Sequence, residues 1–360
     1  MNILITVKCV DCQGGVAQIY KMLQLHKKEN IDYFFSTPTT KNKFFKLLSF
    51  PFKYLQFFRK IKTYDIIHIN PSLDKTAIWR DMLFLILAKF RKKKVIVFMH
   101  GWEDYYEDKI KKSRFLSKLF SFYNKADAFF ILGDVFKEKL ISLGINTLFF
   151  KETTIADNRY IEDFSIEQKI INFRNKNRII KFLFISRIAK GKGMFLAIDI
   201  FNAIQQKNIR NVELIFAGTG KQLEETKQYV KDKNISNVKF VGYIKDKEKH
   251  ILFKKSHFML FPTMFGEGLP NSILEGMLYG MPIISRVNAG ITDWVKNNEN
   301  GFITKSIKAE DFLHFIEIIL KDKNLYQKMA LNNHQIAKEN FVKEVIVKRY
   351  LKYYQTVYTK

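Results

Sequence analysis

The sequence has few of the residues that stabilise secreted or metal-binding proteins. Two cysteines in 360 residues cannot form a disulfide framework. Cys9 and Cys12 form a C-x-x-C pair, but no second cysteine pair supplies the remaining ligands of a zinc site. A redox dithiol is disfavoured because the chain is too long and otherwise patterned for a thioredoxin. We therefore expect a reducing, cytoplasmic environment.

Long hydrophobic runs are also missing. The amino-terminal stretch MNILITVKCV is too short an apolar run for a signal peptide. The longest apolar runs, at 82–88 and 95–99, fall well short of the roughly 20 residues that a membrane-spanning helix needs. We expect a protein that does not cross a bilayer.

Acidic residues are scarce relative to basic ones. The chain has 35 Asp and Glu against 61 Lys and Arg, which gives a net charge of +26. This excess predicts an anionic partner, which could be nucleic acid, an acidic membrane surface or a phosphorylated substrate. Charge alone does not choose among the three.

The length and the alternation of apolar segments predict two α/β domains. A chain of 360 residues exceeds what one hydrophobic core usually organises. Strands are expected in the first half at 2–8, 31–36, 64–69, 94–99, 128–132 and 147–151, and in the second half at 179–186, 212–217, 237–241, 258–261 and 282–285. Their alternation with helical segments predicts doubly wound parallel sheets. The polar span 157–178 is interpreted as the linker and the entry to a second domain, and the sequence after Gly301 as helical.

Candidate ligand contacts in the first half follow predicted strands, because doubly wound sheets bind ligands beyond the carboxyl ends of their strands. Gly14 and Gly15 lie in a turn where glycines let backbone amides approach a diphosphate, although an ordinary strand-to-helix turn is the alternative. His100 directly follows a strand and precedes Gly101. His68 lies inside a strand, and we expect it to be packed.

The segment 41–62, KNKFFKLLSFPFKYLQFFRKIK, combines seven basic residues with many aromatic ones and has no acid. This composition suits a surface or helix that lies on an anionic membrane leaflet. A core-packed helix with a solvated basic edge explains it equally well. Binding of RNA would suit the same composition, but no nucleic-acid motif accompanies it.

Two cations lie between the predicted strand 179–186 and the next helix. Arg187 offers a planar fork of donors, and Lys192 offers a mobile point charge, so both suit a diphosphate. A basic surface turn is the alternative. Gly218 follows the next strand in a glycine turn, and Tyr243 and Ile244 follow the strand after that.

The stretch 261–284, FPTMFGEGLPNSILEGMLYGMPII, predicts a short helix at 271–279. The free amides of its first turn form a ready phosphate site. Asn271, Glu275 and Tyr279 fall on one face of this helix, whereas Ile273 and Met277 point into a core. The residues just before the helix are Glu267, Gly268, Leu269 and Pro270. Two carboxylates eight residues apart therefore bracket a predicted anion site.

Glu267 and Glu275, with Gly-Leu-Pro-Asn between them and Gly-Met-Pro after them, resemble the E-x7-E signature of glycosyltransferase family 4. The resemblance implies the GT-B fold, in which two Rossmann-like doubly wound domains face each other across a cleft. The amino-terminal acceptor domain would span 1–160, joined by a helix at about 340–360, and the nucleotide-sugar domain would span 170–339. Ser186 departs from the pattern, because the family usually has glycine there.

The resemblance also implies roles for individual residues. Catalytic roles fall on His100, Glu267, Arg187 and Lys192. Donor-binding roles fall on Gly14, Gly15, Gly218, Tyr243, Ile244, Gly268, Leu269, Pro270, Asn271 and Glu275. Arg187 and Lys192 would hold the donor phosphates, Glu267 the sugar hydroxyls and Glu275 the ribose. No Asp-x-Asp triplet is present to hold a nucleotide-bound metal, so we expect no metal and no other cofactor.

We therefore expect a retaining glycosyltransferase that moves a sugar from a nucleotide diphosphate sugar to a glycan or lipid-linked acceptor in bacterial surface polysaccharide synthesis. The segment 41–62 would place it on the inner face of the cell membrane. A non-catalytic nucleotide-binding scaffold is one alternative. The presence of Glu267, Glu275, Arg187 and Lys192 argues against it, because a site without activity has no reason to keep four polar groups in register. A nucleic-acid-binding protein is the other, and charge alone supports it.

Overall fold

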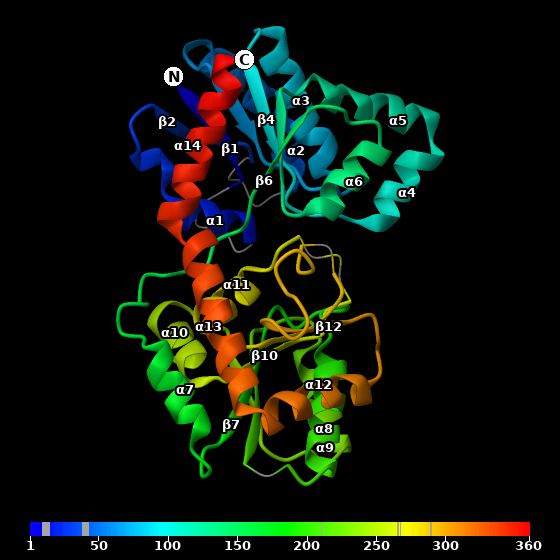
Figure 1. Cartoon of the computed structure of the whole chain (residues 1–360). Coiled ribbons are helices and arrows are strands. Elements are labelled where there is room, and N and C mark those ends of the chain that lie inside the picture. Colours follow the sequence, from blue (N-terminus) through cyan, green and yellow to red (C-terminus); the bar gives the residue numbers. More distant parts are fainter. Residues whose placement is uncertain (9–14, 38–42, 210, 265, 267, 289) are drawn as a thin grey trace. The chain divides into compact units, whose positions relative to one another are not determined.

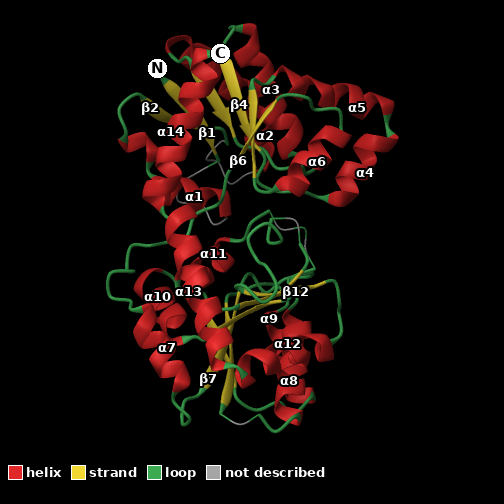
Figure 2. Ribbon diagram, viewed as in Figure 1, coloured by secondary structure: helices red, strands yellow, loops and turns green. Residues whose placement is uncertain are grey.

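The computed structural model describes the whole chain except residues 9–14, 38–42, 210, 265, 267 and 289, and it describes only the backbone of residues 43–47. The chain divides into two compact units, Met1–Ile155 with Lys343–Lys360 and Ala156–Val342. Each unit contains one parallel six-stranded sheet with helices on both faces (Figures 1 and 2). The predicted pair of doubly wound α/β domains is confirmed.

The elements of the first unit follow the predicted alternation of strand and helix. They are β1 (Ile3–Val7), α1 (Gly15–Leu23), β2 (Ile31–Phe35), α2 (Lys43–Lys60), β3 (Ile66–Ile69), α3 (Ala77–Phe90), β4 (Lys94–Phe98), α4 (Asp104–Lys112), α5 (Arg114–Phe120), β5 (Ala128–Ile131), α6 (Asp134–Ser142), β6 (Leu148–Lys151) and α14 (Lys343–Thr359). Short 3-10 turns occur at η1 (Leu25–Lys27), η2 (Ile61–Thr63) and η3 (Ser121–Lys125).

The strand order of the first sheet is β2-β1-β3-β4-β5-β6, and each neighbouring pair is parallel. The order reverses between β1 and β3, which is the position where such sheets bind ligands. Helix α14, from the far end of the chain, packs against this sheet. Its Tyr350 and Tyr354 are fully buried and lie against Phe130 of β5. The carboxyl-terminal helix is therefore part of the core of the first unit.

The second unit begins with a helix and then alternates in the same way. Its elements are α7 (Ile166–Arg174), β7 (Ile180–Ile185), α8 (Met194–Gln206), β8 (Val212–Ala217), α9 (Leu223–Asp232), β9 (Val238–Gly242), α10 (Asp246–Lys255), β10 (Phe258–Phe261), α11 (Asn271–Leu278), β11 (Ile283–Arg286), β12 (Gly301–Thr304), α12 (Ala309–Lys321) and α13 (Lys323–Asn340).

The strand order of the second sheet is β12-β11-β10-β7-β8-β9, again with parallel pairs. The chain enters at β7, winds outward through β8 and β9, and returns to the other side of β7 at β10. The order therefore reverses between β7 and β10, whose register pairs Phe182 with Phe258. The loops that leave β7 and β10 flank this reversal.

One expectation was wrong in the second unit, and another was incomplete. The sequence after Gly301 is not helical throughout, because Gly301–Thr304 forms the edge strand β12 by pairing with β11. A Cβ at Gly301 would lie 2.2 Å from the carbonyl oxygen of Ile283, so glycine is needed for this close pairing. The polar span 157–178 enters the second unit as expected, but it also contains α7, whose Ile166, Ile170 and Phe173 are buried at helical spacing in the core of that unit.

Helix α2, in the basic aromatic segment, is packed in the core along one face, and its predicted contact with a membrane stays a prediction. Phe57 is fully buried and packs against Phe34 and Phe84, whereas Phe52 is 74% exposed. One face of α2 is therefore part of the core, and another presents an aromatic ring to solvent. Among the described residues, none of the helices is both long enough and apolar enough to span a bilayer.

Candidate functional site

The reversal of strand order in the second sheet brings several predicted site residues to one edge. Arg187 and Lys192 lie in the loop that follows β7, and Gly218 follows β8. Residues 262–270 form the connection from β10 to α11. Because β7, β8 and β10 are neighbouring parallel strands, all these loops leave the carboxyl edge of the sheet. This is where doubly wound sheets bind nucleotides.

Hydrogen bonds and close packing join the β7 loop to the β10 loop. The main-chain N–H of Met264 donates to the oxygen of Gly191 at 2.8 Å, and the Thr263 hydroxyl donates to the same oxygen at 3.3 Å. Gly193 has a φ of 85°, and a Cβ there would lie 2.2 Å from the oxygen of Pro262. No larger residue fits at Gly193 without separating the two loops.

The two predicted phosphate-binding cations differ in exposure. The Arg187 side chain is exposed, whereas Lys192 is 6% exposed. Ser186 precedes Arg187, and its main-chain oxygen would lie 1.9 Å from a Cβ at Gly218, whose φ is 140°. The β7 and β8 loops therefore pack as tightly as the β7 and β10 loops. The place where the family usually has glycine is occupied by serine without disturbing this packing.

Helix α11 forms where the sequence predicts it. Pro270 lies at its amino-terminal cap, Asn271 is its first residue, and Leu269 is buried just before it. Gly268 is partly exposed in the same approach. The first-turn amides of α11 therefore lie at the carboxyl edge of the sheet, next to the joined loops, where they can donate to a phosphate.

Glu275 is buried, and its carboxylate is paired. The Lys249 ammonium, on α10, donates to Oε1 of Glu275 at 2.6 Å. Tyr279, the cap residue that follows α11, also contacts α10, because its hydroxyl is 2.6 Å from Nδ1 of His250. The polar face predicted for α11 exists, but it packs on α10. The Lys249 contact involves only Oε1, so Oε2 is the oxygen that a ligand hydroxyl would meet.

A second carboxylate, Asp157, completes a buried charged cluster with Lys249. Its Oδ2 lies 3.7 Å from Nζ of Lys249 and 3.2 Å from Nε2 of His250, and Arg159 holds both its oxygens, at 2.9 and 2.7 Å. Burial opposes ionisation of Asp157, but the hydrogen bonds from Arg159 and the charge of Lys249 outweigh it and hold its pKa below the usual range. Burial likewise opposes the charge of Lys249, and the carboxylates of Glu275 and Asp157 raise its pKa above the ordinary value.

The strand β9 ends beside the β8 loop. The N–H of Gly218 donates to the oxygen of Gly242 at 2.7 Å. Tyr243 is 60% exposed, and Ile244 is partly exposed. Both follow this strand end, as predicted, and their contact with a nucleobase stays a prediction.

Three predicted positions need separate comment. Glu267 and Gly14 lie outside the described residues, so their predicted roles stay predictions. Gly15 is the first residue of α1, and a Cβ there would have nothing within 4 Å. Packing within the described residues therefore does not require glycine at position 15.

In the first unit, His100 belongs to a buried polar network after β3 and β4. Its Nε2 lies 2.7 Å from Oδ1 of Asn70, which also accepts from the Tyr20 hydroxyl at 2.6 Å. Nδ2 of Asn70 donates to the oxygen of Thr6 at 2.8 Å, which fixes the orientation of the amide. Because Oδ1 can only accept, Nε2 of His100 must carry the proton, and Nδ1 is left with a bare lone pair.

Burial keeps this histidine neutral. It lowers the pKa of His100 to about 3. Nδ1 is a buried atom without a hydrogen-bond partner in the part of the chain that the structure describes. His100 can therefore accept a hydrogen bond from a hydroxyl, but it cannot act as a cation at neutral pH. His68 is fully buried, with Nδ1 2.6 Å from the Tyr354 hydroxyl, and its predicted packing is confirmed.

Two residues that hold these groups, Asn70 and Lys249, were not predicted from the sequence. Asn70 directly follows β3 and precedes Pro71, so its place at the end of a predicted strand could have identified it as a candidate site residue. Lys249 lies in the middle of α10, 26 residues before Glu275, and nothing in its neighbourhood distinguishes it from the adjacent lysines. Only the packing of α10 against α11 identifies it.

Residues 165–335 match the protein family described as Glycosyl transferases group 1. This range contains Arg187, Lys192 and Glu275. An uncharacterized glycosyltransferase of Methanocaldococcus jannaschii is 26% identical over 291 residues, which make up 76% of this chain and 71% of that protein. CapM, a capsular polysaccharide biosynthesis glycosyltransferase of Staphylococcus aureus, is 26% identical over 223 residues, which make up 60% of this chain and 55% of CapM.

The solved structure of HepE of Anabaena, in complex with UDP and glucose, is similar over 99% of both chains, with a TM-score of 0.73 and 16% identity. The fold is therefore that of the GT-B glycosyltransferases, as predicted. Together with the sequence relatives, this supports an enzyme of the glycosyltransferase kind.

Proposed function

We propose that this protein is a retaining, metal-independent glycosyltransferase of family 4. It transfers a sugar from a nucleotide diphosphate sugar to a glycan or lipid-linked acceptor in surface polysaccharide synthesis. One observation carries the proposal: the loop with Arg187 and Lys192 is bonded to the loop that leads into α11, at the strand reversal of the second sheet. The donor class is supported by HepE, which was solved with UDP and glucose.

The donor diphosphate would be held by fixed positive groups. Arg187 provides a planar pair of N–H donors and Lys192 a point charge. The first-turn amides of α11 add further donors and the positive end of a helix dipole. These groups stabilise the charge that develops on the leaving phosphate, which is the work a metal ion performs in other sugar transferases.

The remaining groups would orient the donor. Oε2 of Glu275 is available to a ribose hydroxyl, while Lys249 holds Oε1. Glu267 would accept from the sugar hydroxyls, and Nδ1 of His100 would accept from another. In the reaction, the bond from the sugar carbon to the phosphate oxygen breaks, a bond to the acceptor oxygen forms on the same face, and the acceptor proton passes to the departing phosphate.

The acceptor would be reached at an anionic membrane surface. Helix α2 presents Phe52, Leu48 and Leu55 to solvent, with 74%, 53% and 46% of their surface exposed. Exposed aromatic and aliphatic groups beside lysines are typical of helices that lie at a lipid interface. The similarity to CapM, which acts in capsular polysaccharide biosynthesis, supports a surface glycan as product.

A screen of UDP-, GDP- and ADP-sugars by thermal shift tests the donor class, and transfer in EDTA tests metal independence. We expect one nucleotide sugar to raise Tm, and Arg187→Ala to abolish that shift. Lys190→Ala is the matched control, because Lys190 is an exposed cation of the same loop that lies out of the predicted register. If no nucleotide sugar stabilises the protein, or if both variants behave alike, the proposed donor site is wrong.

A further inference from the structure

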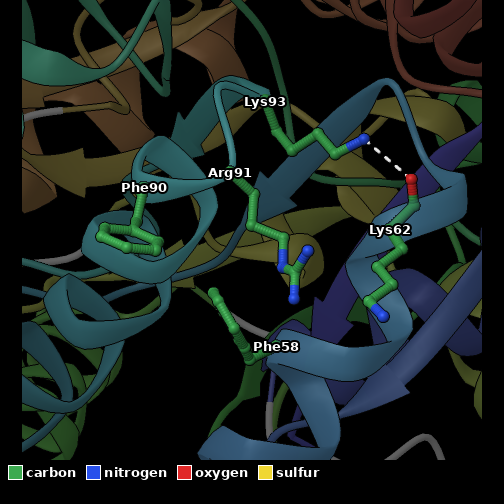
Figure 3. Close-up of a pocket in the computed structure, with 5 residues that line it drawn as sticks. All are labelled: Phe58, Lys62, Phe90, Arg91 and Lys93. Atoms are coloured by element: carbon green, nitrogen blue, oxygen red, sulfur yellow. Dashed lines mark hydrogen bonds between the residues drawn. The ribbon is translucent and has the colours of Figure 1, made fainter.

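A basic pocket lies in the first unit between the end of α2 and the end of α3. It has a volume of about 470 Å³. Its lining residues are Phe58, Lys62, Phe90, Arg91 and Lys93 (Figure 3). Three of the five are cations and none is an acid. The pocket is below called the Arg91 pocket, and it shares no residue with the predicted donor site.

The helix pair α2 and α3 builds the pocket. Phe57 of α2 packs on Phe84 of α3 with ring centroids 4.7 Å apart. This contact places the next residue, Phe58, beside Phe90, with centroids 5.9 Å apart. The chain turns sharply after α3 at Lys92, whose φ is 55°. The walls of the pocket are therefore set by the packing of two helices.

Two contacts hold the cations in place. The guanidinium of Arg91 lies over the ring of Phe58, 3.9 Å from its centroid. The ammonium of Lys93 donates to the main-chain oxygen of Lys62 at 2.9 Å (Figure 3). A guanidinium stacked on a ring keeps its in-plane N–H groups available to an acceptor. Nε of Arg91 is a buried atom that has no hydrogen-bond partner among the residues described.

This donor set fits a phosphate group. A phosphate oxygen pair accepts two parallel N–H bonds from a guanidinium, and its charge favours the ammonium groups of Lys62 and Lys93. A neutral ligand would leave three neighbouring cations uncompensated. No carboxylate lines the pocket to compete with the ligand.

The apolar surroundings indicate a lipid as the source of the phosphate. Phe90, at the pocket itself, is 78% exposed. Leu48, Phe52 and Leu55 form an exposed stripe on α2, because residues at i, i+4 and i+7 share one helix face. Exposed apolar side chains of this size do not contribute to the binding of a free phosphate ion. They can pack among acyl chains beside a bound headgroup.

We propose that the Arg91 pocket binds the phosphate of an anionic lipid headgroup while Phe90 and the α2 stripe enter the interface. This deepens the membrane association proposed above and rests on it. It adds a defined headgroup site, separate from the donor site, to what would otherwise be diffuse attraction by net charge.

The test measures binding of the full chain to vesicles of phosphatidylcholine with and without phosphatidylglycerol, by flotation. We expect binding only with phosphatidylglycerol, and a loss of more than about tenfold in the partition coefficient for Arg91→Gln, since charge-assisted bonds to phosphate are lost. Arg91→Lys should fall between, because lysine lacks the planar fork. Lys92→Asn is the control: it removes one charge next to the pocket, keeps a residue that tolerates positive φ, and should cost at most about fivefold.

Equal losses of vesicle binding for Arg91→Gln and Lys92→Asn would contradict a headgroup site in the Arg91 pocket and would indicate diffuse electrostatic attraction instead. A second arm adds inorganic phosphate to the protein without vesicles. If phosphate alone raises Tm in the wild type but not in Arg91→Gln, and vesicle binding is the same in both, the site takes free phosphate and the lipid assignment is wrong. Circular dichroism confirms that each variant folds. The nucleotide-sugar screen is read separately, so failure of this pocket leaves the donor site untouched.

Discussion

The ammonium of Lys249 lies 2.6 Å from Oε1 of Glu275 and 3.7 Å from Oδ2 of Asp157. One lysine on α10 thereby joins the helix that would bind the donor to the segment that begins the second unit. Glu275 is 4% exposed and Asp157 is 2% exposed, so the paired cations offset the cost of burying each carboxylate. In the proposed donor site, Lys249 would be a positioning residue that acts on the donor through Glu275.

Replacement of this lysine should be costly. Lys249→Met leaves Glu275 buried without its cation, and we expect the free energy of unfolding to fall by about 3 kcal/mol. Lys247→Met, an exposed position on the same helix, should change it by less than about 0.5 kcal/mol. Urea denaturation measures both. Because the penalty comes from an unpaired charge, the double variant Lys249→Met with Glu275→Leu should recover part of the loss, and no recovery would contradict this explanation.

His100 should be found in a single tautomer. The network through Asn70 requires the proton on Nε2, and burial lowers the pKa of His100 to about 3, so long-range 1H–15N NMR spectra should show neutral imidazole with Nε2 protonated down to about pH 5. Asn70→Leu removes the acceptor and should give a mixture of tautomers. A predominant Nδ1–H form in the wild type would contradict the assignment.

Stability should decrease in mild acid because several histidines are buried and neutral. Burial lowers the pKa of His257 to about 3, as it does for His100, and it also lowers the pKa of His68 well below the ordinary value. Between about pH 6.5 and 3 the unfolded chain binds protons that the folded chain does not, so the free energy of unfolding falls as the pH falls.

The free energy of unfolding should fall by roughly 1.4 kcal/mol per pH unit for each such histidine. Asp157 adds to the loss at lower pH, because its pKa is depressed in the folded state and its contribution disappears as the carboxylate is protonated. Urea denaturation at a series of pH values measures the slope, and His257→Asn should make it shallower. A stability that is flat from pH 7 to pH 4 would contradict the predicted neutral state of these residues.

Replacement by alanine should have different effects on stability at Gly218 and at Gly15. A Cβ at Gly218 would lie 1.9 Å from the oxygen of Ser186, and the φ there is 140°, so we expect Gly218→Ala to cost more than about 2 kcal/mol of stability and to weaken donor binding. A Cβ at Gly15 meets nothing within 4 Å, so Gly15→Ala should fold normally. If it nevertheless lowers activity, glycine at position 15 serves the ligand and not the packing. Thermal denaturation and transfer assays separate the two outcomes.

The sequence predicted most elements well because strands and helices have local signatures. Strand β8 was predicted at 212–217 and is Val212–Ala217, and α11 starts at the predicted residue after Pro270. Strand β12 was missed because its four residues have no helical or alternating pattern of their own, and it exists only through pairing with β11. Helix α7 was missed because its buried face is short and set among polar residues.

The sequence by itself determined the alternation of strand and helix, the position of the two cations after β7, and the start of α11 at Pro270 and Asn271. Each of these features depends only on residues that are close together in the sequence. Tertiary structure alone decided that Lys249 holds Glu275, that Asn70 sets the tautomer of His100, and that Phe58 supports Arg91. These contacts join residues 26 to 33 positions apart, on different elements. They form only when the faces of helices and strands pack together, and no local sequence pattern indicates which faces will be in contact.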